Sequence, residues 1–112
     1  MSGKTLANVI FALTAVTLVG IAGPAYAAET VVDQHDLKFV PNAVTIAAGD
    51  TIRFTDSDHI THNITIVGPD GTAEDKGMDR YKQDIVVPFA KAGVYQVHCR
   101  IHPAMTMTVT VK

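Results

Sequence analysis

The last residues of the chain alternate strictly between apolar and polar side chains, and this pattern limits the possible folds more than any other. In "MTMTVTV", residues 105–111, two methionines and two valines alternate with three threonines. A period of two over seven residues puts the apolar side chains on one face of a β-strand and does not fit one face of a helix. The segment is therefore predicted to be a strand with one buried face.

Other short segments alternate in the same way and end in turn residues. They are "AVTIAAGD" (43–50), "TIRFTD" (51–56), "HNITIVG" (62–68), "QDIVVPFAKAG" (83–93) and "GVYQVHC" (93–99). Residues 68–80, "GPDGTAEDKGMDR", are rich in glycine and charge and are expected to form a loop with at most one helical turn. Short strands at this spacing predict an all-β fold, a Greek-key β-sandwich or barrel of about six to eight strands.

The first 27 residues resemble a secretory signal peptide more than part of a domain. Lys4 gives a positive start, residues 6–21 are apolar and uncharged, and Ala25-x-Ala27 fits a signal-peptidase site. The alternative is a retained transmembrane anchor, for which the apolar run is short. We therefore expect cleavage after Ala27, export to the periplasm, and one domain of residues 28–112 without a membrane span.

The predicted domain of 85 residues is small, so a bound metal would help to stabilise it. Eight basic and eleven acidic residues follow residue 27, which gives a formal charge of −3 with neutral histidines. The absence of a basic run and of tryptophan argues against nucleic-acid binding. No paired carboxylates, Ser-His-Asp order or glycine-rich phosphate loop indicates an enzyme.

The segment "VHCRIHPAM", residues 97–105, holds the chain's only cysteine, followed at intervals of three by a histidine and a methionine. Exported proteins usually pair their cysteines, so Cys99 is a free thiol, a partner for another chain or a metal ligand. Only five residues separate Cys99 from Met105, which places both on one tight loop with His102 between them. Pro103 stiffens this loop and biases His102 toward an extended backbone.

A thiolate, an imidazole and a thioether together favour copper over magnesium or calcium. A zinc site would be expected to recruit further cysteines or a carboxylate. A trigonal copper site with a weak axial methionine needs one more imidazole. His62 is the best candidate because it precedes Asn63 and begins an alternating strand, and His59 is the alternative.

Two segments also carry a resemblance to a known family. "GDTIRFTDSDHITHNITIVG" (49–68) and "AGVYQVHCRIHPAM" (92–105) are similar to the two motifs of the cupredoxins, the type 1 blue copper proteins. The Cys-x-x-His-x-x-Met spacing is closest to the amicyanin and plastocyanin-like members. The chain departs from them at Arg100-Ile101, where proline is frequent, and at Ala104, where an aromatic residue is common.

The resemblance implies a cupredoxin-like fold and one type 1 copper ion. His62, Cys99 and His102 would be the in-plane ligands and Met105 the axial ligand. Asn63 would hydrogen-bond between the loops that carry His62 and Cys99.

The implied function is electron transfer by a monomer, not enzymatic catalysis. The partners would be a redox donor and acceptor, such as a dehydrogenase and a c-type cytochrome. Ile101, Pro103 and Ala104 would surround the His102 edge as a docking patch, and Arg100 could steer an acidic partner.

Other readings of the site remain open from the sequence. A copper-delivery protein would use further ligands, for which His59, His98, Met78 and Met107 are available. A copper enzyme is disfavoured because four protein ligands leave no position for a substrate. The remaining residues are expected to have no part in the site: His35 faces solvent, and His98 is a surface or packed residue turned away from Cys99. Glu74, Asp75 and Asp79 are expected in a solvated loop, with an electrostatic docking patch as the alternative.

Overall fold

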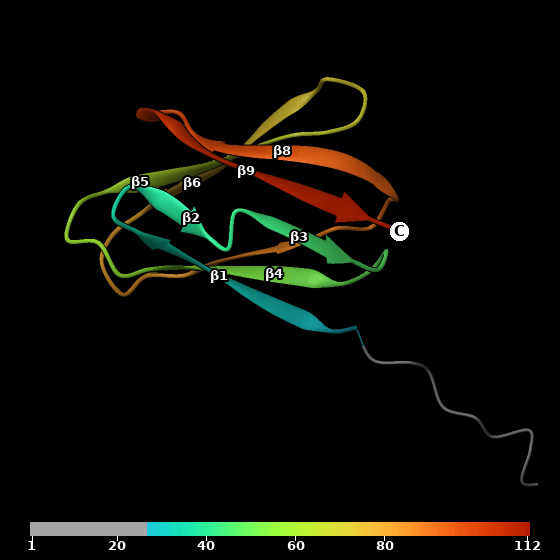
Figure 1. Cartoon of the computed structure of the whole chain (residues 1–112), viewed down its shortest axis with the longest axis horizontal. Helices are drawn as coiled ribbons and strands as arrows, with labels where there is room; N and C mark the ends of the chain where they lie inside the picture. The colour runs from blue at the N-terminus through green and yellow to red at the C-terminus, as the bar shows by residue number, and fades with distance from the viewer. Residues whose placement is uncertain (1–26) are drawn as a thin grey trace, which may run out of the picture.

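A computed structural model describes residues 27–112, which fold into nine strands in two layers (Figure 1). The strands are β1 Glu29–His35, β2 Lys38–Val40, β3 Ala43–Ile46, β4 Thr51–Asp56, β5 His62–Val67, β6 Ala73–Asp79, β7 Ile85–Pro88, β8 Gly93–Cys99 and β9 His102–Val111. The predicted signal peptide, except for Ala27, lies outside the described residues. Within the described range, no helix is long and apolar enough to cross a membrane.

The two layers are a four-stranded sheet, ordered β2-β1-β4-β7, and a five-stranded sheet, ordered β3-β9-β8-β5-β6. The pairs β1–β4 and β3–β9 are parallel, and the other neighbours are antiparallel. Because β3 lies in the opposite sheet from β1 and β4, the chain crosses between the layers as it runs. The predicted all-β sandwich is confirmed, with one strand more than the upper limit expected.

The core lies between the layers and is built from the inward half of each alternating strand. The residues with no exposed surface include Val32, Ile52, Phe54, Ile64, Val97 and Val109. Met105, Met107 and Val111 on β9 are also buried, as the C-terminal alternation predicts. Burial of a side chain of this size stabilises the fold by about 1.5–3 kcal/mol.

The prediction of a loop over residues 68–80 was wrong, because this segment contains β6. β6 is an edge strand that pairs with β5, and most of its residues are exposed. Without a buried face it has no reason to alternate, so the sequence pattern does not reveal it. Its pairing shifts register between Asn63 and Thr65, opposite Gly77, whose φ of 112° suits glycine.

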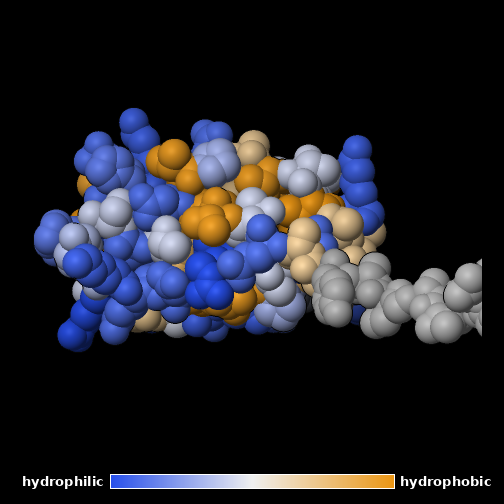
Figure 2. All heavy atoms as spheres, turned by 90° about the horizontal axis from the view of Figure 1, so that it is seen from below, coloured by the Kyte–Doolittle hydropathy of each residue, from blue (hydrophilic) through white to orange (hydrophobic). Residues whose placement is uncertain are grey.

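The loops that follow β4, β6 and β8 gather at one end of the sandwich, on the left of Figure 1. Figure 2, turned by 90°, shows that hydrophilic side chains dominate this end, while hydrophobic residues are spread over the middle of the molecule. Three of the four predicted metal ligands, His62, Cys99 and His102, begin or end strands at this end, and Met105 is the fourth residue of β9.

Candidate metal centre

Three side chains from separate strand ends converge on one point. His62 is the first residue of β5, Cys99 the last residue of β8, and His102 the first residue of β9. The His62 and His102 Nδ1 atoms are 3.3 Å apart. The Cys99 Sγ lies 3.5 Å from the His102 Nδ1 and 4.0 Å from the His62 Nδ1. The sequence-predicted histidines and cysteine therefore form a small triangle.

Adjacent strands of the five-stranded sheet hold this triangle in place. β8 lies between β5 and β9, and Cys99 pairs with His102 across the tight turn that joins β8 to β9. His62 and Cys99 are fully buried, whereas His102 keeps part of its surface exposed. Met105, three residues further along β9, is also buried. Of these four side chains, that of His102 is the one with an appreciable exposed surface.

The spacing of the three ligand atoms fits one metal ion. In a trigonal site the ligand atoms surround the metal at angles of about 120°. Metal–ligand bonds of about 2.0–2.3 Å then place neighbouring ligand atoms about 3.5–3.7 Å apart. The observed separations, 3.3–4.0 Å, bracket this value. A sulfur and two imidazole nitrogens are ligands that suit copper. The residues present therefore fit the metal that the sequence predicts.

Asp58 sets the orientation and the protonation of His62. Its Oδ2 lies 2.8 Å from the His62 Nε2, and since a carboxylate only accepts, this contact assigns the imidazole proton to Nε2. The Nδ1 lone pair is thereby left free to face Cys99 and His102. Oriented ligand histidines commonly have such a carboxylate partner. Sequence reasoning missed Asp58, although an acid four residues before a ligand histidine is a usable signal.

Asp58 also fastens the turn between β1 and β2. Its carboxylate accepts hydrogen bonds from the backbone N–H groups of Asp36, at 2.8 Å, and Leu37, at 3.0 Å. Burial alone would raise the pKa of Asp58, but the hydrogen bonds from Leu37, His62 and Asp36 outweigh it and lower the pKa below its usual value. Asp58 is therefore a charged carboxylate near neutral pH.

Asn63 connects the strand of one ligand to the strand of another. Its backbone N–H donates to the Cys99 sulfur across 3.2 Å. Its Oδ1 accepts from the Arg100 N–H, at 3.1 Å, and from the Thr65 hydroxyl, at 2.7 Å. These contacts join the start of β5 to the end of β8, as the resemblance implied for this residue.

Asp75 holds the other half of the Asn63 amide. Its Oδ1 accepts from Asn63 Nδ2 at 2.8 Å and from the Gly77 N–H at 2.9 Å, and both bonds lower its pKa. Its Oδ2 pairs with the Arg100 Nε at 3.2 Å. Asp75 is exposed, as expected, but the expectation that it lies in a loop was wrong, because it belongs to β6 and holds Asn63 and Arg100. Arg100, expected to steer a partner, is held in an ion pair.

A second acid of the predicted loop, Asp79, is 1% exposed, so the expectation that it is solvated was also wrong. It pairs with His62 in the β5–β6 ladder, and its Oδ2 accepts from Gln34 Nε2 at 2.6 Å. Burial raises the pKa of Asp79 to about 6. The hydrogen bond from Gln34 lowers this pKa, and the negative charge of the neighbouring Asp56 raises it. Among the described residues, Gln34 Oε1, Asp56 Oδ2 and Asp79 Oδ1 are buried without a hydrogen-bond partner.

The further ligands considered for copper delivery do not join the triangle. His59 is exposed and stacks on Tyr81, with ring centres 3.9 Å apart. His98 pairs with its neighbours in the ladders, Met78 is exposed on β6, and Met107 lies in the core. None of these four residues therefore adds a ligand to the triangle. Oxygen and nitrogen atoms do gather beside it, because His35, Asp36 and Asp58, and likewise Asp56, Asp58 and His62, each bring possible ligand atoms within 4.8 Å of one another.

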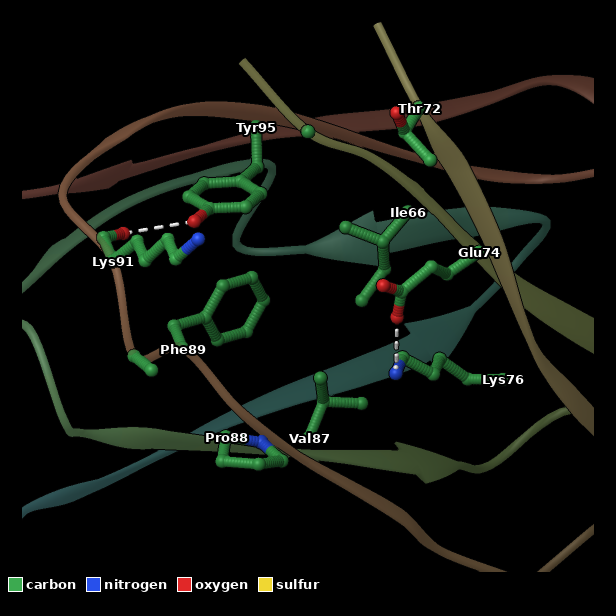
Figure 3. Close-up of a pocket in the computed structure, with 11 residues that line it drawn as sticks. Ile66, Thr72, Glu74, Lys76, Val87, Pro88, Phe89, Lys91 and Tyr95 are labelled. Atoms are coloured by element: carbon green, nitrogen blue, oxygen red, sulfur yellow. Dashed lines mark hydrogen bonds and ion pairs between the residues drawn. The ribbon is translucent and has the colours of Figure 1, made fainter. Parts of the chain in front are cut away.

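A hollow of about 200 Å³ lies at the opposite end of the sandwich (Figure 3). Its floor is apolar, formed by Ile66, Val87 and Phe89. At its rim Glu74 pairs with Lys76 at 2.6 Å, and the Tyr95 hydroxyl donates to the Lys91 carbonyl at 2.8 Å. It is lined by neither cysteine nor histidine, so its chemistry differs from that of the metal centre.

Comparison with known proteins agrees with the geometry. A family model described as copper binding proteins of the plastocyanin/azurin family matches residues 26–112. Plastocyanin of Ulva pertusa is 31% identical over 90 residues, covering 71% of this chain and 92% of the relative. Amicyanin of Paracoccus denitrificans is 33% identical over 84 residues, covering 73% and 64%, respectively.

Solved structures of amicyanin variants share the fold. A variant in its reduced Cu(I) form at pH 4 superposes with a TM-score of 0.69 at 27% identity, covering 84% of this chain and 88% of the other. A variant in the oxidised state gives 0.70 at 28% identity, with coverage of 75% and 82%.

Proposed function

Because this chain belongs to the plastocyanin/azurin family of copper-binding proteins, we propose that it carries single electrons between redox partners. The cofactor of the family is one type 1 copper ion. Copper, when bound, supplies a couple between Cu(I) and Cu(II) that exchanges one electron. The observation that carries the proposal is the convergence of His62 Nδ1, Cys99 Sγ and His102 Nδ1 within 4.0 Å of one another.

Four side chains are proposed to hold the ion. His62, Cys99 and His102 provide the strong ligands, and Met105 provides the weak axial one. Their strands are paired and packed, Asp58 orients the first histidine, and Asn63 donates to the sulfur. A cage fixed in this way changes little with the charge of the ion, which lowers the reorganisation that accompanies electron transfer.

The exposed part of His102 is the proposed exit for the electron. Apolar residues flank it at the same end of the sandwich: Ile101, Pro103 and Ala104 in sequence, with Leu37 and Ile60 on the adjacent loops. A small apolar patch of this kind suits a brief encounter that buries less than about 1,200 Å². We propose that the protein is a monomeric electron carrier, not an enzyme.

The proposed location is the periplasm, on the strength of the signal-peptide pattern in residues 1–27. A dehydrogenase as donor and a c-type cytochrome as acceptor are the proposed classes of partner. The copper-delivery alternative has no support from the geometry, since its additional ligands lie elsewhere.

The visible and EPR spectra of the domain with one equivalent of Cu(II) test this proposal. We expect an intense thiolate-to-copper absorption band and a narrow hyperfine splitting, both lost on reduction. The Cys99→Ser variant should lose the band, while Met78→Gln, which alters an exposed sulfur on β6, should keep it. A pale, ordinary Cu(II) spectrum of the wild type would show that Cys99 is not a ligand and would overturn the proposal.

A further inference from the structure

Free basic side chains border the exposed end of the metal centre. We call Lys38, Arg80 and Lys82 the cationic rim. All three are exposed, and none has a carboxylate of residues 27–112 within ion-pair distance. They are therefore free to act on an approaching molecule.

Contacts place the rim around the proposed exit. Lys38 lines a shallow hollow together with Ala104 and Met105, which follow His102. On the other side, the loop after β6 carries the second and third rim residues. Lys82 donates its backbone N–H to the Asp56 carbonyl at 2.8 Å, which ties this loop to the end of β4.

An exposed aromatic pair extends the same surface. Tyr81, between the two rim residues of the loop, stacks on His59, three residues before His62. The Lys82 ammonium lies 5.3 Å from the centre of the Tyr81 ring, which fixes a positive charge over an aromatic face. Figure 2 shows the hydrophilic character of this end of the molecule.

The acids at this end are mostly engaged or buried. Asp58 accepts hydrogen bonds from three N–H groups, and Asp33 accepts from two hydroxyl groups. Two more acids form ion pairs, Asp75 with Arg100 and Asp84 with Arg53. Asp56 and Asp79 are buried. Asp36 is the highly exposed exception, and it lies 3.5 Å from the His35 imidazole. Hydrogen bonds do not remove the charge of these carboxylates, but the exposed charged side chains of this surface that have no ion-pair partner among residues 27–112 are mainly basic, although the domain as a whole carries −3.

On the basis of the proposed electron-carrier function, we propose that the redox partner presents carboxylates around the exposed edge of its own cofactor. The net charge of this domain would favour a basic partner, whereas the cationic rim selects an acidic one. The Debye length is about 10 Å at 0.1 M salt, so charges at the interface outweigh those at the far end. Complementary charges of this kind steer encounter and fix orientation.

Two small oxidants of opposite charge test the electrostatic potential around the exposed part of His102. The reduced copper protein is mixed by stopped flow with hexacyanoferrate(III), an anion, or tris(phenanthroline)cobalt(III), a cation. One electron passes from Cu(I) to Fe(III) or Co(III), which leaves Cu(II) with Fe(II) or Co(II). The rim variant carries Lys38→Gln, Arg80→Gln and Lys82→Gln.

The control variant carries Lys76→Gln, Lys91→Gln and Lys112→Gln, which remove the same total charge outside the cationic rim. Lys76, in the middle of β6, and Lys91 line the hollow of Figure 3, and Lys112 follows β9. We expect the rim variant to react about tenfold more slowly with the anion and faster with the cation. The control variant should stay within about twofold of wild type for both.

The same variants are then mixed with two c-type cytochromes, one acidic and one basic around the haem edge. We expect the rim variant to lose rate with the acidic cytochrome alone. Equal changes in the rim and control variants, or a faster wild-type reaction with the basic cytochrome, would overturn the inference. If wild type transfers no electron to either small oxidant, the proposed function itself fails.

Discussion

The backbone N–H of Asn63 donates to the sulfur of Cys99 across 3.2 Å, beyond the point where the β5–β8 ladder ends. The last pair on that side joins Thr65 to His98, and no further ladder pair follows toward Asn63. The Cys99 sulfur therefore takes the place that a carbonyl would have in a longer sheet. The position of one proposed ligand is set from the neighbouring strand, which makes the site sensitive to that strand.

Asn63→Ala should lower the stability of the copper-free domain. The change removes an amide that spans Arg100, Thr65 and Asp75, and it leaves buried groups without partners. We expect the free energy of unfolding to fall by about 2–4 kcal/mol, measured by urea denaturation. Thr45→Ala, on an exposed position of β3, should change it by less than about 0.5 kcal/mol. Equal losses in the two variants would contradict the bridging role.

Asp58→Asn should weaken copper binding. Asparagine keeps one acceptor oxygen and carries no charge, so its amide N–H must face either the N–H of Asp36 or those of Leu37 and His62, and the hold on the histidine ring weakens. We expect a loss of about 10–100-fold in affinity, measured by competition with a chelator. Asp36→Asn removes a carboxylate from the same turn without touching His62, and it should leave the affinity unchanged. An undiminished affinity in Asp58→Asn would show that the contact does not orient the ligand.

Met105→Gln should keep the copper and lower the reduction potential. An amide oxygen is a harder ligand than a thioether and favours Cu(II) over Cu(I). Protein-film voltammetry measures the shift, with Met78→Gln as the control for an exposed methionine. A potential unchanged in Met105→Gln would remove this residue from the axial position.

Asp79 should make the copper-free domain less stable as the pH rises. Its folded pKa of about 6 lies above the ordinary value of 3.8, so the folded state binds the proton more tightly. The free energy of unfolding should therefore fall between pH 4 and pH 6 by up to about 3 kcal/mol from this group, and stay low above pH 6. Below the unfolded pKa the group has no effect on the slope.

Asp79→Asn isolates this contribution from those of Asp58 and Asp75, whose lowered pKa values act in the opposite direction. Urea denaturation of both proteins at pH 4, 6 and 7.5 gives the difference. We expect the variant to be the more stable protein at pH 7.5, because its amide offers a donor to the unpartnered oxygens of Gln34 and Asp56. Glu74→Gln, an exposed change on the same strand, should leave the pH dependence as it is. A wild-type slope that survives in Asp79→Asn would refute the assignment.

Much of the fold could be predicted from alternation alone. The pattern at residues 105–111 and the segments that became β3, β4, β7 and β8 each have one more deeply buried face, so period and structure agree. β5 also alternates between apolar and polar residues, but both of its faces are buried. β6 was not predicted because most of this edge strand is exposed, so its sequence does not alternate between apolar and polar residues. β2 has only three residues, too few for any pattern.

The proposed ligands could be predicted from the sequence because three of them lie within residues 99–105, where short spacing fixes proximity, although His102 and Met105 belong to β9 and not to a loop. His62 was favoured over His59 by its neighbour Asn63, and the structure brings His62 to the triangle while His59 packs on Tyr81. The hydrogen-bond partners and the burial of Asp58 and Asp79 could not be predicted from the sequence. Asp79 meets Gln34, 45 residues away, and only the folded topology brings this pair together.

All four proposed ligands belong to β5, β8 and β9, three neighbouring strands of one sheet. The other sheet contributes core packing, and the loop after β4 contributes the carboxylate of Asp58. Part of the proposed recognition surface, at Leu37 and Lys38, lies outside the three strands that carry the ligands, so related chains can diversify that part while preserving the ligand set.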